Sequence, residues 1–221
     1  MRIEVLDDPA AAVAELLTET AAAGGQIVLT GGSSPRRAYE LAARGDWGRA
    51  TVWYGDERCV PEDHEWSNHG MAEAALLSHL DPRPEVLRMQ GELGHERGAR
   101  GYEDLVRERL GDEPRWDLLL LGLGPDAHTA SLFPGKPEVA VTDRLVVGVP
   151  EAGMEPQVPR ITLTLPAINA ARHVVFLVTG ESKRDAVRRA FGEDPDPTSP
   201  AAHVRPRSGE LTVYLDPAAK P

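Results

Sequence analysis

Short apolar runs alternate with helix-forming stretches along most of the chain, and this alternation constrains the fold more than any other feature. The runs that resemble buried strands are residues 3–6, 26–30, 51–54, 118–121, 145–149, 173–178 and 211–215. The stretches with helical patterns are residues 9–23, 34–43, 67–80, 96–110 and 182–191. Such an order is typical of parallel strands joined by crossover helices. The sequence therefore predicts one α/β domain over residues 1–221, with a mostly parallel sheet flanked by helices.

Charge and cysteine content exclude several classes of function. The net charge of -11 repels phosphate backbones and anionic lipids, so we expect neither a nucleic-acid nor a membrane partner, and any anionic ligand needs a local cluster of donors. A single cysteine, Cys59, excludes an internal disulfide and a multi-cysteine zinc site. No apolar run reaches the ~20 residues of a membrane span. We expect a cytoplasmic protein, a monomer or weak dimer, that binds a small molecule.

The segment TGGSSPRR, residues 30–37, lies between a predicted strand and a predicted helix. In a parallel sheet, ligands bind where such strands end. Gly31, Gly32 and Ser33 would let the backbone approach a ligand closely and direct free N–H groups at a phosphate. Ser34 and Pro35 also fit an ordinary helix start, with Ser34 as the capping residue. Both interpretations stay open for this segment alone.

The segment WYGDERCVP, residues 53–61, places charged residues after the next strand. Asp56, Glu57 and Arg58 read more simply as a solvated charge cluster than as a site. Cys59 is an unconvincing nucleophile, because no histidine partner can be assigned to it from sequence.

The segment GLGPDAHTASLFPG, residues 122–135, follows an apolar run and carries Asp126 and His128 two positions apart. Its glycines match a loose dinucleotide-binding pattern, but Asp126 would then lie beside the pyrophosphate. A P-loop is excluded because no Lys-Ser/Thr pair follows the glycines. An acid beside an imidazole suits general base catalysis, although a loop histidine is more often structural.

Two further cations precede or follow predicted strands. Arg160 stands at the start of the run PRITLTLPAIN, residues 159–169. Lys183 lies in the first turn of a predicted helix, where the helix dipole disfavours a cation unless an anion binds there. A surface lysine tolerated at small cost is the alternative.

Together these segments resemble the successive signature segments of the 6-phosphogluconolactonase family. The resemblance runs in order from residue 30 to about residue 187, with DAHTASLFP as its most specific part. It implies a Rossmann-like fold shared with glucosamine-6-phosphate deaminase and ribose-5-phosphate isomerase, and hydrolysis of 6-phosphogluconolactone in the pentose phosphate pathway, without metal or cofactor. It implies that His128 is the catalytic base, accompanied by Asp126. The implied substrate and phosphate contacts are Gly31, Gly32, Ser33, Asp56, Arg58, Arg160 and Lys183.

One departure and two alternatives accompany this resemblance. The family usually has glycine where this chain has Ala127, and alanine adopts positive φ less readily. Backbone N–H groups near Gly124, or a cationic side chain, are candidates to stabilise an oxyanion. An amino-sugar phosphate deaminase remains possible, although the acid expected soon after the histidine is absent. A sugar-phosphate sensor without chemistry is the other alternative, and it would have no need for the Asp126 and His128 pair.

Overall fold

A parallel sheet of seven strands forms the centre of the molecule. The computed structural model describes residues 1–221. All neighbouring strands of this main sheet pair in parallel. In spatial order they are β1 (Arg2–Val5), β10 (Glu210–Leu215), β9 (His173–Val178), β6 (Leu118–Leu121), β2 (Gln26–Leu29), β3 (Thr51–Tyr54) and β5 (Glu85–Val86).

A second, smaller sheet was not distinguished by the sequence. It is antiparallel and contains β4 (Asp56–Arg58), β8 (Arg160–Leu163) and β7 (Val146–Val149). The apolar run at 145–149, which we grouped with the other predicted strands, therefore belongs to this sheet. Its register sets Arg58 opposite Arg160 and Asp56 opposite Thr162. The two predicted segments that carry these arginines are thus neighbours in space.

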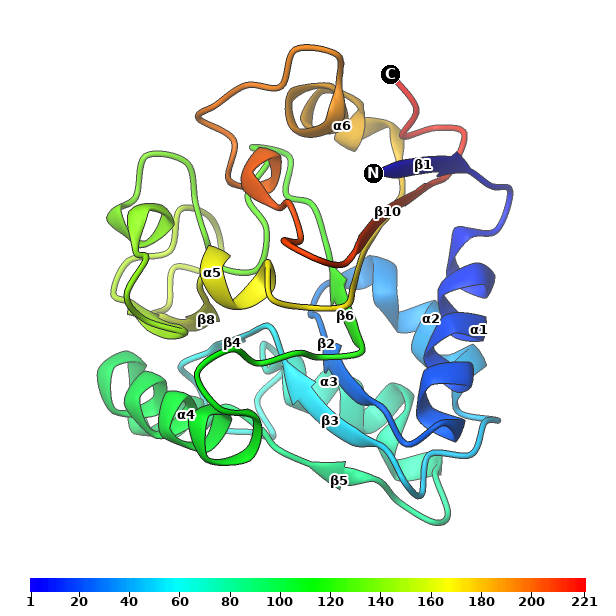
Figure 1. The fold of residues 1–221 in the computed structure, drawn as a ribbon, viewed down its shortest axis with the longest axis vertical. Helices are drawn as coiled ribbons and strands as arrows, with labels where there is room; N and C mark the ends of the chain where they lie inside the picture. Colours follow the sequence, from blue (N-terminus) through cyan, green and yellow to red (C-terminus); the bar gives the residue numbers. More distant parts are fainter.

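Six α-helices cover the sheets. They are α1 (Pro9–Ala22), α2 (Ser33–Ala42), α3 (Asn68–Ala75), α4 (His95–Leu110), α5 (Leu165–Ile168) and α6 (Arg184–Phe191). In Figure 1, α1 and α2 lie on one side of the main sheet, and α4, α5 and the small sheet lie on the other. The single-domain α/β architecture expected from the alternating pattern is confirmed. No helix combines the length and apolar character that crossing a membrane requires.

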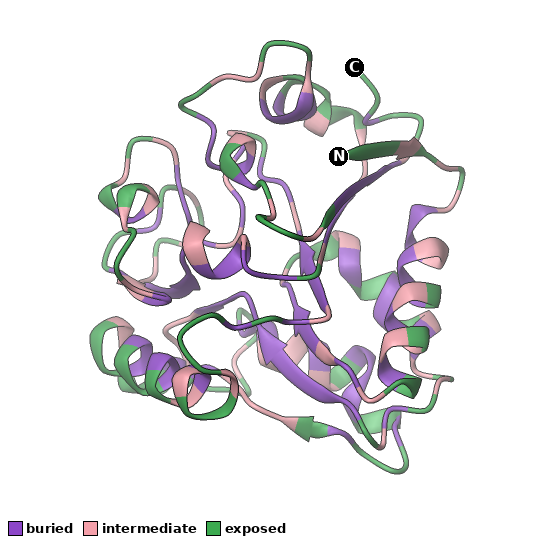
Figure 2. Cartoon of the chain, in the orientation of Figure 1, coloured by how far each residue is buried: buried purple, intermediate pink, exposed green.

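The hydrophobic core lies along the central strands. All four leucines of β6 are buried, as are the apolar residues of β2, β3 and β9 (Figure 2). Strands buried on both faces appear in the sequence as continuous apolar runs, because helices or a second sheet cover each face. Trp47, Trp53 and Trp116 are fully buried in the same core. This packing gives the loops at the carboxyl ends of β2, β3, β6 and β9 a rigid base.

The start of α2 differs from the prediction. The helix begins at Ser33, and its N-cap is Gly32, with φ 101° and no capping side chain. The expectation that Ser34 caps this helix is wrong, because the Ser34 hydroxyl pairs with the Thr179 hydroxyl at 2.9 Å. A residue at this φ is in the region that favours glycine. The first N–H groups of α2 are therefore left without a side-chain partner.

Candidate active site

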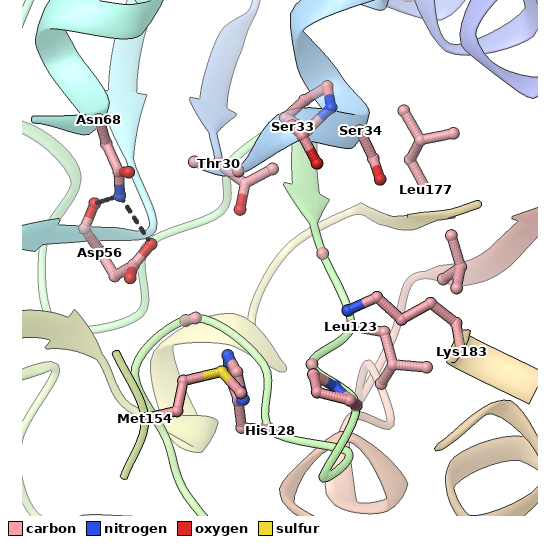
Figure 3. Close-up of a pocket in the computed structure, with 18 of the residues that line it drawn as sticks. Thr30, Ser33, Ser34, Asp56, Asn68, Leu123, His128, Met154, Leu177 and Lys183 are labelled. Atoms are coloured by element: carbon pink, nitrogen blue, oxygen red, sulfur yellow. Dashed lines mark hydrogen bonds between the residues drawn. The ribbon is translucent and has the colours of Figure 1, made fainter. Parts of the chain in front are cut away.

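A cavity of about 210 Å³ opens at the carboxyl ends of the central strands, where doubly wound sheets bind ligands. Figure 3 shows it from within, with Ser33 and Ser34 on one side, His128 on the opposite side, and Lys183 reaching in from a third. It brings together every residue that the family resemblance assigned to the site except Asp126, which contacts His128 but does not line the cavity. The predicted residues on its wall are Gly31, Gly32, Ser33, Asp56, Arg58, His128, Arg160 and Lys183.

Asp126 and His128 form a hydrogen-bonded pair. The His128 Nδ1 lies 2.6 Å from Asp126 Oδ1, and the same oxygen accepts the His128 backbone N–H at 3.1 Å. The His128 side chain is only 17% exposed, and Phe133 packs on its ring at 4.7 Å between centroids. Burial raises the pKa of Asp126, but the bond to His128 outweighs it and the net pKa is lowered. A carboxylate that accepts from Nδ1–H leaves Nε2 as the basic nitrogen.

The loop that carries this pair is folded tightly on itself. The Gly124 N–H donates to the His128 carbonyl at 2.8 Å, and the Ala127 N–H donates to the Gly124 carbonyl at 3.0 Å. A side chain at Gly124 would overlap the His128 ring and would approach Asp126 Oδ1 to 2.7 Å. Glycine is therefore required at 124 for space. Its N–H is engaged within the loop, so this group does not serve an oxyanion.

Ala127 adopts a backbone conformation that favours glycine, which is the usual residue at this position in the family. Its φ is 65°, in the left-handed region, and its side chain is fully buried. An L-residue in this region costs roughly 1–2 kcal/mol relative to the right-handed one. The surrounding loop thus holds alanine in a glycine conformation, with Ala201 donating its N–H to the Ala127 carbonyl at 3.2 Å.

Three cations face the cavity without a carboxylate within 4.0 Å: Arg58, Arg160 and Lys183. Arg160 is 4% exposed and donates only to the carbonyls of Pro156 and Val158. Burial lowers the pKa of both Arg160 and Lys183. Buried charge without a counter-ion is costly. Three such cations in the lining of one cavity would be compensated by a bound anion.

The N-terminus of α2 adds to this positive region. Ser33 and Ser34 lie on the cavity wall at the first turn of the helix. No side chain caps that turn, and it contains no acidic residue. Free backbone N–H groups and the helix dipole both favour an anion at such a position. Of the two interpretations of the glycine segment, the structure supports the anion-binding one.

Asp56 is a buried acid of this cavity, and the interpretation of residues 56–58 as a solvated cluster is wrong. Asp56 is 6% exposed and Glu57 is 3% exposed. Glu57 accepts hydrogen bonds from the backbone N–H groups of Arg58, Asn68 and His69, at 2.7 to 2.8 Å. Hydrogen bonds within the protein thus take the place of water around these two carboxylates. The sequence does not show this, because most of the donors come from other segments of the chain.

Several lining residues were missed from the sequence. Asn68 donates to Asp56 from the start of α3, and Met154 projects from the 150–159 loop beside His128 in Figure 3. Thr179, which pairs with Ser34, also lies on the wall. The serine–asparagine step before α3 was the available signal, because Ser67 caps that helix. Cys59 does not line the cavity, and burial raises the pKa of its thiol to about 11.

These features define a class of protein. The molecule is an α/β protein with an oriented histidine and unpaired cations in one cavity at the carboxyl edge of a parallel sheet. Such a site suits acid–base chemistry on a small anionic substrate.

Comparison with known proteins narrows this class. Residues 3–213 match the family model described as glucosamine-6-phosphate isomerases/6-phosphogluconolactonase. A 6-phosphogluconolactonase of Synechocystis is 42% identical over 204 residues, which cover 88% of this chain and 83% of the relative. The human 6-phosphogluconolactonase is 41% identical over 174 residues, covering 77% of this chain and 67% of the relative. The chain belongs to the glucosamine-6-phosphate isomerase/6-phosphogluconolactonase family.

Solved structures give the same result for the fold. The 6-phosphogluconolactonase from Trypanosoma cruzi superposes with a TM-score of 0.87 at 29% identity, covering 99% of this chain and 95% of that one. A monomeric glucosamine-6-phosphate deaminase superposes with a TM-score of 0.84 at 20% identity, over 99% of this chain and 98% of that one. The fold expected from the resemblance, including its relation to the deaminase, is confirmed.

Proposed function

We propose that this chain hydrolyses 6-phospho-D-glucono-1,5-lactone to 6-phosphogluconate, with His128 as the general base. One observation carries the proposal: an oriented histidine and three cations without carboxylate partners share a single cavity. The lactone carries two groups that match this cavity: an ester carbonyl for the histidine and a phosphate for the three cations. The names of the relatives described above support the same reaction.

His128 supplies the proton transfers. Its Nε2 takes a proton from water as the oxygen attacks the C1 carbonyl, and the imidazolium then returns a proton to the ring oxygen as the ester bond breaks. Asp126 keeps Nδ1 protonated and stabilises the imidazolium through the 2.6 Å contact. Acid–base help of this kind is typically worth ~10²- to 10⁴-fold. No step requires a group from outside the chain other than water.

The phosphate is held by the positive part of the cavity. Arg160, Lys183 and Arg58 neutralise its charge, and the first turn of α2 after Gly31 and Gly32 donates backbone N–H groups. Asp56 and Ser33 remain for the sugar hydroxyls. Because the Gly124 N–H is engaged in the loop, we assign stabilisation of the oxyanion to one of these same three cationic side chains.

Substrate choice tests the proposal against its alternatives. We expect purified protein to accelerate the opening of freshly generated 6-phosphogluconolactone above its spontaneous rate and to leave glucosamine 6-phosphate unchanged. Release of ammonia from glucosamine 6-phosphate would favour the deaminase. Binding of 6-phosphogluconate without any acceleration would favour a sensor that lacks chemistry. Both outcomes would overturn the lactonase assignment.

A further inference from the structure

Asp56 shares the cavity with cations that attract it, yet it pairs with none of them. Arg58 and Arg160 both line the same wall, and neither has a carboxylate within 4.0 Å. The negative charge of Asp56 acts on Arg160, because it opposes the effect of burial on the pKa of that guanidinium. An acid this close to a buried, uncompensated arginine should form an ion pair unless something restrains it.

Two hydrogen bonds supply that restraint. The Ser131 hydroxyl donates to Asp56 Oδ2 at 2.6 Å, and the Asn68 amide donates to Asp56 Oδ1 at 3.2 Å, the contact drawn in Figure 3. The hydroxyl bond is short, as expected for a charged acceptor. Each oxygen of the Asp56 carboxylate thereby accepts one hydrogen bond from the protein, and these bonds fix the carboxylate in place.

Ser131 is itself anchored to the small sheet. It is 1% exposed, and its backbone N–H donates to the Thr162 hydroxyl at 3.1 Å. Thr162 is the register partner of Asp56 in the pairing of β4 with β8. The loop that carries His128 is therefore attached to β4 through Asp56 and to β8 through Thr162, and Ser131 makes both attachments.

The backbone just before Ser131 is strained. Ala130 has φ 49°, in the left-handed region, although it is not glycine. Strained residues persist where surrounding contacts hold them, and they concentrate at functional sites. Ala130 is held by contacts on both sides. The next residue, Ser131, makes the two hydrogen bonds described above, and the Leu132 N–H donates to the Thr129 carbonyl at 3.0 Å, which closes a turn. This left-handed turn immediately precedes the residue whose hydroxyl contacts Asp56.

We propose that Ser131 is a positioning residue that keeps Asp56 away from the cavity arginines, so that they stay free for the substrate phosphate. This inference rests on the proposed phosphate-binding role of those arginines. Held this way, Asp56 presents its remaining lone pairs to the sugar hydroxyls. Without the Ser131 hydroxyl, Asp56 turns toward Arg160 and neutralises a charge that the phosphate needs.

Binding of inorganic phosphate, measured by isothermal titration calorimetry, tests the proposal without any turnover. We expect Ser131→Ala to weaken phosphate binding roughly 10-fold, equivalent to ~1.4 kcal/mol. Ser199→Ala is the matched control, because Ser199 is equally buried and its hydroxyl has no partner. That control should bind phosphate as the wild type does. If Ser131→Ala unfolds the protein, Ser131→Cys keeps the volume with a weak donor and should act in the same direction.

A double-mutant cycle separates positioning from a general structural effect. In Asp56→Asn, phosphate should bind at least as tightly as in the wild type, because no carboxylate competes for Arg160. Adding Ser131→Ala to Asp56→Asn should then leave phosphate binding unchanged. A purely structural role of Ser131 would weaken binding equally in both backgrounds, and that additivity would overturn the proposal.

The remaining outcomes are also decisive. Wild-type phosphate affinity in Ser131→Ala would overturn the proposal, and so would a wild type that does not bind phosphate. Lactone hydrolysis is measured separately on the same proteins. A wild type that binds phosphate with the predicted cycle but opens no lactone contradicts the proposed reaction and leaves the role of Ser131 standing.

Discussion

In the proposed reaction Asp126 orients His128, because one of its oxygens binds both the ring and the backbone N–H of that residue. Replacing it with asparagine would keep the shape and remove the charge that fixes the tautomer. We expect Asp126→Asn to lower kcat by ~10²-fold or more. Binding of 6-phosphogluconate should change less than about threefold. Steady-state kinetics and calorimetry check the two parts, and an unchanged kcat would contradict the orienting role.

Replacing Ala127 with glycine would have one stabilising and two destabilising effects. Glycine would relieve the left-handed backbone, worth roughly 1–2 kcal/mol. It would also remove a fully buried methyl group, worth ~0.8 kcal/mol, and add ~0.5–1 kcal/mol of chain entropy to the unfolded state. We expect Ala127→Gly to change the free energy of unfolding by less than about 1 kcal/mol in urea titrations. A stabilisation above ~2 kcal/mol would mean that the alanine is more strained than its φ of 65° indicates.

Single residues also show where sequence reasoning reached its limit. His128, Lys183 and Arg160 were recognised because an unusual residue type stood at a strand end or helix start. Ser131 carries no such signal, and the only signal at Asn68 is the capping serine before it, which marks a helix start and not a site. Their roles come from contacts with Asp56, which is 75 residues from Ser131 and 12 from Asn68.

Among the secondary-structure elements, α4 is tied to the small sheet by a buried acid. Glu103 on α4 accepts from the Leu145 N–H at 2.7 Å and forms ion pairs with Arg144 and Arg107. Burial raises its pKa, but these partners outweigh burial and the net pKa is lowered from 4.5. A lowered folded-state pKa stabilises the protein above the unfolded value, and this stabilisation is lost as pH falls through the folded value.

Glu103→Gln tests this link. We expect the variant to lose about 1–2 kcal/mol of unfolding free energy at pH 7, because it removes the charge that accepts the Leu145 N–H, while its arginine partners are 38–40% exposed and screened by water. The difference from the wild type should shrink as the pH falls below about 4.5, once the wild-type carboxyl is protonated. Chemical denaturation at several pH values gives both quantities. A difference that stays constant down to pH 3 would contradict the assignment.

The elements predicted correctly were those with an apolar signal. The strands of the main sheet were recognised except β5, which has only two residues. In the small sheet, β4 reads Asp-Glu-Arg, so nothing apolar marked it as a strand. The start of α2 was misplaced because Ser34 has the residue type of a cap, whereas the helix begins one residue earlier, at the backbone turn of Gly32. Hydrogen bonding between distant segments decides such cases.

The whole molecule carries a net charge of -11, which would repel an anionic substrate. The structure resolves this by concentrating three cations and a helix N-terminus in one cavity while other arginines pair with acids on the surface. Local donors outweigh the distant field because surface charges are screened over about 10 Å at 0.1 M salt. The expectation that an anion would need a local donor cluster, drawn from the sequence charge, agrees with this arrangement.

The rate of 6-phosphogluconolactone opening with wild type and with His128→Ala tests the central claim most directly. His79→Ala serves as the control, because His79 is exposed and does not line the cavity. We predict that wild type and control accelerate the opening equally, and that His128→Ala loses at least ~10²-fold while still binding 6-phosphogluconate. Full activity in His128→Ala would contradict the role of His128 as the base, and no acceleration by wild type would contradict the reaction itself.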